Sequence, residues 1–230
     1  MRALFVVVLA GALLFAETPS SVLNLTATTA NVAGAPDPVR IEILRWSTDE
    51  ERTRLASAWD LTSVASGGPG AGKGTGKGAA KQGKGGAKGG AKGPGPGGVS
   101  AATQTPEAAL ARALQEVTTV GYLWSSEIAG YALRYAGKID SPDGSERVVL
   151  ITQRKLGAMN QVWRPAVDGP ANPYEFSVIE LHLNAKGEGE GKVSLTGKIA
   201  ADAGAKIVTV ENYNALPVVL RDVRMRAAQP

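Results

Sequence analysis

Acid–base or metal chemistry in this chain would centre on a single histidine. His182 follows Glu180 by two positions in the run Ile179-Glu180-Leu181-His182-Leu183. Alternate side chains of a strand share a face, so the imidazole and the carboxylate would point together, away from the three apolar residues. Such a pair could act as a general base or help to hold a metal ion. A metal needs three or more ligands, and the sequence has no second histidine and no cysteine. We therefore favour a polar outward face, with no catalytic residue and no metal site.

A second candidate site is a glycine-rich string. The segment Gly67-Gly68-Pro69-Gly70-Ala71-Gly72-Lys73-Gly74-Thr75 resembles the phosphate loop of adenylate kinases. A working phosphate loop lies between a buried strand and a helix, whose backbone N–H groups converge on the phosphates. Glycine and lysine continue for more than twenty residues after this string, so no helix is expected there. We expect no nucleotide site and no cofactor.

Aromatic side chains are the candidates for ligand binding. They could line the interior or the mouth of a barrel and hold a lipid or another apolar or amphipathic ligand. The alternative, core packing, is left open by the sequence. The candidates are Trp46, Trp124, Tyr131 and Trp163.

The positive charge is concentrated in one low-complexity stretch, residues 66–98. Subtracting Arg2 and the six lysines of this stretch from the 25 basic residues of the chain leaves 18 basic residues against 21 acidic ones. The stretch could contact anionic envelope surfaces weakly and in a salt-dependent way, or could be a solubilising insertion. No aromatic residue is interleaved, so we expect no specific nucleic-acid binding. The six lysines are Lys73, Lys77, Lys81, Lys84, Lys88 and Lys92.

The N-terminus has the layout of a secretory signal peptide. Met1-Arg2 is followed by 13 apolar residues, Ala3 to Phe15, and polar residues begin at Glu17. We expect residues 1–16 to be removed, because 13 helical residues reach about 20 Å, short of a bilayer core of about 30 Å. No later stretch predicts a transmembrane segment. The protein is expected to be exported, periplasmic or extracellular, and the lack of cysteine favours a bacterial envelope.

The elements that would position these residues are mostly strands. A capping box, Ser47 to Glu50, predicts a helix to about Trp59, and Thr105-Pro106 predicts the start of a second helix. Short connections predict an antiparallel meander that forms a barrel or sandwich, a mainly β (α+β) fold with two short helices. We expect one domain: residues 17–65, a disordered Gly/Lys-rich insertion at 66–98, and residues 99–230. Strands are expected at 23–32, 39–46, 120–125, 131–136, 147–153, 179–183, 193–199, 206–212 and 218–226, with a hairpin loop at 186–191.

Three strings carry a resemblance to a family. They are Ile43-Leu44-Arg45-Trp46-Ser47-Thr48-Asp49-Glu50-Glu51-Arg52, Val120-Gly121-Tyr122-Leu123-Trp124, and the segment from Ile179 to Lys192. Together they resemble an uncharacterised family of exported bacterial proteins over residues 24–60 and 105–226. The resemblance implies an envelope context and no site residue.

Two hypotheses of function follow from the sequence. The first is a non-catalytic barrel or sandwich that binds an apolar or amphipathic ligand. The second is a structural or interaction module whose lysine-rich tether contacts anionic surfaces. An enzyme ranks third, because general acid–base chemistry needs positioned groups and none stand out.

Overall fold

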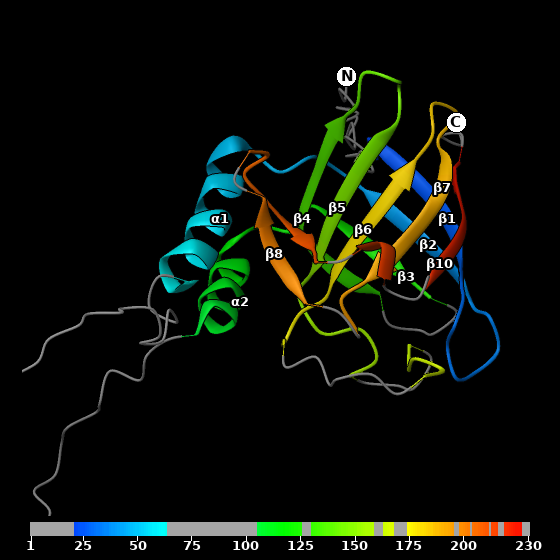
Figure 1. Ribbon diagram of the computed structural model, residues 1–230, viewed down its shortest axis with the longest axis horizontal. Coiled ribbons are helices and arrows are strands. Elements are labelled where there is room, and N and C mark those ends of the chain that lie inside the picture. Colours follow the sequence, from blue (N-terminus) through cyan, green and yellow to red (C-terminus); the bar gives the residue numbers. More distant parts are fainter. Residues whose placement is uncertain are drawn as a thin grey trace, which may run out of the picture.

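The chain forms a closed eight-stranded antiparallel barrel in the order β1-β10-β7-β6-β5-β4-β3-β2 (Figure 1). The computed structural model describes residues 21–63, 105–125, 130–158, 163–167, 174–195, 198–202, 204–211, 213–215 and 219–226. The predicted signal peptide and Gly/Lys-rich insertion lie outside these residues. The barrel strands are β1 (Leu23–Thr29), β2 (Pro38–Ile43), β3 (Gly121–Trp124), β4 (Tyr131–Asp140), β5 (Glu146–Thr152), β6 (Val178–Leu183), β7 (Glu188–Val193) and β10 (Leu220–Met225).

This topology confirms the predicted mainly β meander with two helices. Strands β2 to β7 follow one another as antiparallel neighbours, as short connections predict. Strand β10 then pairs with both β7 and β1 and closes the sheet, so that no barrel strand is left with an unpaired edge.

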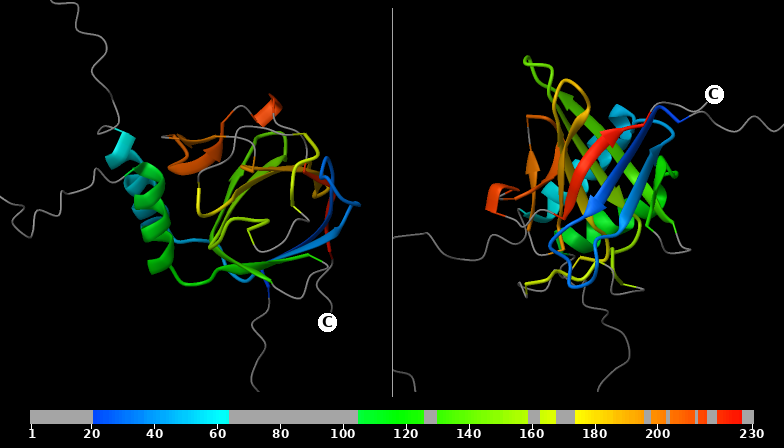
Figure 2. Two further views of the ribbon diagram at one scale, coloured as in Figure 1. Left: turned by 90° about the horizontal axis from the view of Figure 1, so that it is seen from below. Right: turned by 90° about the vertical axis from the view of Figure 1, so that its right-hand side faces the viewer.

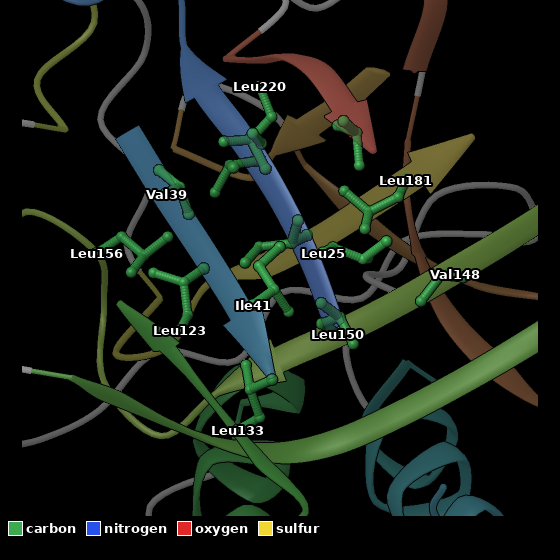
Figure 3. Packing of buried hydrophobic residues seen from close by; sticks show 14 of the residues in the cluster. Leu25, Val39, Ile41, Leu123, Leu133, Val148, Leu150, Leu156, Leu181 and Leu220 are labelled. Carbon is green, nitrogen blue, oxygen red and sulfur yellow. The ribbon is translucent and has the colours of Figure 1, made fainter. Parts of the chain in front are cut away.

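Apolar side chains fill the inside of the barrel (Figure 3). In β2, Val39, Ile41 and Ile43 are buried, whereas Arg40 between them is exposed. The same period of two in the other strands turns one apolar face inward. Buried inward residues on neighbouring strands, among them Leu25, Leu123, Leu150 and Leu181, have no exposed surface.

One end of the barrel is closed by the connection between β5 and β6. Trp163 from this connection is 1% exposed and belongs to the interior cluster, together with Leu156. The connection is tied to the β1–β2 loop by a bridge between Val32 and Pro165. The β4–β5 and β6–β7 hairpins both lie at the opposite end (Figure 1).

A second apolar cluster covers one side of the barrel from outside. Helices α1 (Asp49–Ser63) and α2 (Pro106–Glu116) pack there beside the hairpin of β8 (Ile199–Asp202) and β9 (Ile207–Val210) (Figures 1 and 2). The cluster joins outward residues of β4, β5 and β6, such as Tyr135, Val149 and Val178, to Leu55 of α1 and Leu110 of α2.

The start of α1 differs from the prediction by one residue. Thr48 and Glu51 form the reciprocal pair: the Thr48 hydroxyl accepts from the Glu51 N–H, and the Glu51 carboxylate accepts from the Thr48 N–H. Ser47 instead bonds the backbone of Ala136 in β4 through its own N–H and hydroxyl. The predicted cap at Thr105 is confirmed, because its hydroxyl accepts from the Ala108 N–H.

Two predictions near β7, one of a loop and one of a strand, are wrong. The expected loop at 186–191 is too long, because the turn ends at Gly187 and β7 begins at Glu188. The expected strand 193–199 is two elements: β7 ends at Val193, and Ile199 opens β8 in a separate two-stranded sheet.

Gly189 explains why a strand this rich in glycine can pair here. A Cβ at Gly189 would lie 1.8 Å from the carbonyl oxygen of His182, so only glycine allows the close approach of β7 to β6.

Among the described residues, no helix has the length and apolar character needed to cross a bilayer.

Candidate functional site

The four aromatic residues predicted to bind ligand do not converge. Trp163 and Tyr131 are buried in the interior cluster, and Trp46 packs against it with part of its surface exposed. Trp124 points outward from β3, since its neighbour Leu123 faces the interior. Core packing therefore explains the positions of Trp163 and Tyr131. The six lysines predicted to contact polyanions lie outside the described residues.

An open cleft of about 1040 Å³ lies across three structural units at one end of the barrel. The β4–β5 hairpin, the β6–β7 hairpin and β10 each contribute to it. Most of its lining residues are polar, and two are aliphatic, Ile139 and Leu183. The remaining lining residues are Ser141, Ser145, Glu146, Arg147, His182, Asn184, Glu188, Gly189, Glu190, Arg221 and Asp222.

Strand register places several of these charges in a row on the outer face of the barrel. His182 of β6 lies opposite Arg147 of β5 on one side and Glu190 of β7 on the other. In the next row, Glu180 lies opposite Lys192. Side chains directly opposite on neighbouring strands are close enough to interact, so β5, β6 and β7 hold one charged cluster.

Glu180 is the centre of this cluster. Its side chain is 2% exposed because β9 lies over it. One carboxylate oxygen, Oε1, lies 2.8 Å from the Nε2 of His182, and the other, Oε2, accepts from the Thr209 hydroxyl and, at 3.0 Å, from the Val210 N–H. Arg147 lies 3.9 Å from Oε1. The carboxylate thus fastens β9 to the outside of the barrel.

These contacts decide the charge of Glu180. Burial alone raises the pKa of its carboxyl group, but hydrogen bonds from His182, Thr209 and the Val210 N–H outweigh burial and leave the pKa below its ordinary value. Glu180 is therefore ionised at neutral pH. An ionised carboxylate only accepts, so the Nε2 of His182 carries the hydrogen of their bond.

Arg147 links the same carboxylate to the β8 strand. Its Nη2 lies 2.8 Å from the Oδ2 of Asp202, the last residue of β8. A backbone hydrogen bond from Ala205, as the largest cause, and the Arg147 guanidinium together lower the pKa of the Asp202 carboxyl group. The Arg147 guanidinium is thereby fixed at the edge of the cleft by two carboxylates.

Tyr213 from the short helix η1 (Tyr213–Ala215) covers the other side of the cluster. Its ring stacks on His182, with centroids 4.0 Å apart and an interplanar angle of 9°. The ammonium group of Lys192 lies 4.3 Å from the same ring centroid and donates to the Tyr213 carbonyl oxygen at 2.8 Å. Burial, as the largest cause, raises the pKa of the Tyr213 hydroxyl, which stays protonated.

The cluster presents polar groups to the cleft. His182 keeps 47% of its side chain exposed and presents an oriented imidazole edge to the cleft. Its partner Glu180 accepts from three donors and thereby fixes the orientation of the ring. In the part of the chain that the structure describes, no group of three His, Cys, Asp or Glu residues could hold a metal ion.

Sequence reasoning identified part of this site and missed its cover. The shared face of Glu180 and His182 is confirmed by their 2.8 Å contact. The expected solvated face is wrong for Glu180, because Thr209 and Val210 cover it from β9. The sequence does place the Glu180 carboxylate in the middle of a strand. That position alone does not show that the carboxylate is covered, because the cover comes from β9.

No protein-family model, no curated protein and no solved structure matches this chain.

Proposed function

We propose that the protein is an exported, non-catalytic binding protein that holds a small amphipathic ligand with a cationic head in the end cleft. The single observation that carries this proposal is the cleft itself, which joins polar groups and aliphatic surface at one place. The barrel interior is instead occupied by buried side chains. The aromatic residues had suggested a ligand in the interior or at the mouth of the barrel, and this proposal places it in the cleft at one end instead.

The charges of the cleft favour a cationic head. Its carboxylates come from Glu146, Glu188, Glu190 and Asp222, against the guanidinium groups of Arg147 and Arg221. Arg147 is paired with Asp202 and Glu180. Glu146 and Glu190 are paired with Lys138 and Lys192, which leaves Glu188 and Asp222 against Arg221. An ammonium group placed near Glu188 and Glu190 would gain charge-assisted hydrogen bonds. The half-buried Ile139 would contact the apolar part of the same molecule, whereas Leu183 is 2% exposed and belongs to the barrel interior.

In this proposal Glu180 has a positioning role and is not itself a general base. A general base must be able to take a proton near the working pH. The carboxylate of Glu180 has a lowered pKa and is fully engaged with three donors, so it orients His182 and accepts no proton at neutral pH.

Calorimetric titration of the full-length protein with decylamine and decanoate, each below its micellar concentration, tests the ligand class. Decylamine is expected to bind more tightly. Changing Glu188 and Glu190 together to Gln should weaken decylamine binding by about tenfold, equivalent to about 1.4 kcal/mol. The matched control changes Glu175 and Glu211, two exposed carboxylates outside the cleft. Equal binding of the two amphiphiles, or equal loss in the control, would reject the proposal.

The second hypothesis, an interaction module for anionic surfaces, keeps a specific observation in its favour. Six of the basic residues fall within residues 66–98, while the remaining mature chain is acidic. Deleting residues 66–98 should abolish retention on anionic vesicles at low salt. Unchanged retention would dismiss a role for these lysines.

A further inference from the structure

Within the part of the chain that the structure describes, no helix packs on the outer face of four strands on the side opposite α1 and α2. Figure 2 (right) shows β10 in red and β1 and β2 in blue facing the viewer, with no helix in front of them. Helices α1 and α2 and the β8–β9 hairpin cover β4, β5 and β6 instead. The face formed by β10, β1, β2 and β3 is called the arginine face below, for the residues it carries.

One row of this face joins two arginines to a tryptophan. Thr26 of β1 lies opposite Arg224 of β10 on one side and Arg40 of β2 on the other. Arg40 in turn lies opposite Trp124 of β3. Each of the four follows or precedes a buried inward residue, so all four point outward. Neighbouring strands are about 4.8 Å apart, so the row is about 14 Å long.

Other side chains strengthen the positive charge around this row. Arg221 lies opposite Thr28 of β1, and Arg226 donates its backbone N–H to Asn24 of the same strand. The described acidic residues of the four strands are Glu42 and Asp222, against three arginines, Arg40, Arg221 and Arg224. Arginine keeps its charge at any physiological pH and binds carboxylate or phosphate with two parallel hydrogen bonds.

The half-buried Trp124 ring lies at the end of the row. A Cβ on Gly130 would lie 2.6 Å from the Trp124 ring, so glycine at this position lets the ring lie against the chain. The ring is further held by Tyr122, whose centroid is 5.7 Å away, and by the Arg40 guanidinium 5.5 Å from its centroid. An aromatic ring beside cationic side chains can pack against a cyclic group that also carries a negative charge.

We propose that the arginine face binds an acidic polysaccharide laid across the strands. Its acidic groups bind Arg224 and Arg40, and a sugar ring lies against Trp124. A polysaccharide fits better than a lipid surface, because the charges lie in a line that ends at a single aromatic plate. The lining of the amphiphile cleft includes none of these three residues, although Arg221 and Asp222 belong to both surfaces.

The direct test measures binding of the full chain to polygalacturonate as a function of salt. The double variant Arg40→Gln/Arg224→Gln should weaken binding at least tenfold and reduce the salt dependence. Its matched control, Arg54→Gln/Arg154→Gln, removes two arginines away from the face and should change binding less than twofold. The lysines of residues 66–98 are present in both variants and therefore do not contribute to the difference.

A second pair of variants separates the aromatic contribution from charge. Trp124→Ala should weaken polygalacturonate binding about fivefold with the salt dependence unchanged, and Trp124→Phe should restore most of the affinity. Equal binding by the arginine double variant and its control would overturn the proposal. So would an equal loss on phosphatidylglycerol vesicles or on a single-stranded oligonucleotide, because that would make the face a charge-only surface. Decylamine binding in the cleft should stay the same in all these variants.

Discussion

The carboxylate of Glu180 bonds the imidazole of His182 at 2.8 Å from a position almost completely buried on the outside of the barrel. These two residues of β6 thus have different roles. Glu180 fastens the β8–β9 hairpin to the barrel through Thr209 and Val210, while His182 presents its edge to the cleft. The stability of the hairpin and the shape of the cleft are therefore coupled through one carboxylate.

Glu180→Ala should lower the free energy of unfolding by about 3 kcal/mol. The change leaves the Val210 N–H and the Thr209 hydroxyl without their acceptor under β9, and unsatisfied buried donors are costly. Urea denaturation followed by far-UV circular dichroism gives the value. Glu188→Ala, at an exposed position of the neighbouring strand, is the control and should change stability by no more than about 0.5 kcal/mol. Equal effects of the two changes would show that Glu180 is not an anchor.

The contribution of Glu180 should depend on pH in a defined direction. Its folded-state pKa lies below the ordinary value of 4.5, so ionisation stabilises the folded state above about pH 4.5. This stabilisation is lost as the pH falls through the folded-state pKa. The difference in unfolding free energy between the natural protein and Glu180→Gln should therefore shrink between pH 7 and pH 3. A difference that stays constant over this range would contradict the assignment of a paired, ionised carboxylate.

Trp163 should be needed for its volume and much less for its N–H group. Its side chain is 1% exposed in the interior cluster, and its Nε1 has no hydrogen-bond partner among the described residues. Trp163→Ala should cost about 3–5 kcal/mol of stability, whereas Trp163→Phe should cost much less. Thermal unfolding of both variants is the measurement. A loss in Trp163→Phe as large as in Trp163→Ala would mean that the indole N–H has a role of its own.

The helix cap offers a local test of the backbone assignment. Thr48→Ala should destabilise the protein by about 1 kcal/mol, because the first turn of α1 loses the acceptor for the Glu51 N–H. Glu50→Ala should cost less, since Glu51 makes the reciprocal bond to the Thr48 N–H. Chemical denaturation distinguishes the two, and a larger cost for Glu50→Ala would favour the cap predicted one residue earlier.

The fold was predictable where the alternation of side chains was strong. Val39, Ile41 and Ile43 alternate with polar residues and lie inward as expected, and Thr105-Pro106 begins a helix as expected. Glycine hid the start of β7, because Gly189 reads as loop in a sequence although its missing Cβ is what permits strand pairing. Turn-like composition and close strand packing both favour glycine, and the sequence alone does not separate them.

The candidate site was less predictable because it depends on contacts distant in sequence. The partners of Glu180 on β9 lie 29 and 30 residues away, and Arg147 meets Asp202 at a separation of 55 residues. Periodicity places side chains on faces but does not say which outer face another element covers. For the same reason Trp124 was grouped with Trp163, although one faces outward and the other lies inside.

The most direct test of the account is an amide NMR titration of the full-length protein with decylamine. The cleft assignment predicts the largest chemical-shift changes from Glu146 to Arg147 and from His182 to Glu190, with little change at the interior residues Leu25, Ile41 and Leu123. Changes concentrated at those interior residues and at Trp163 would place the ligand inside the barrel and contradict the account.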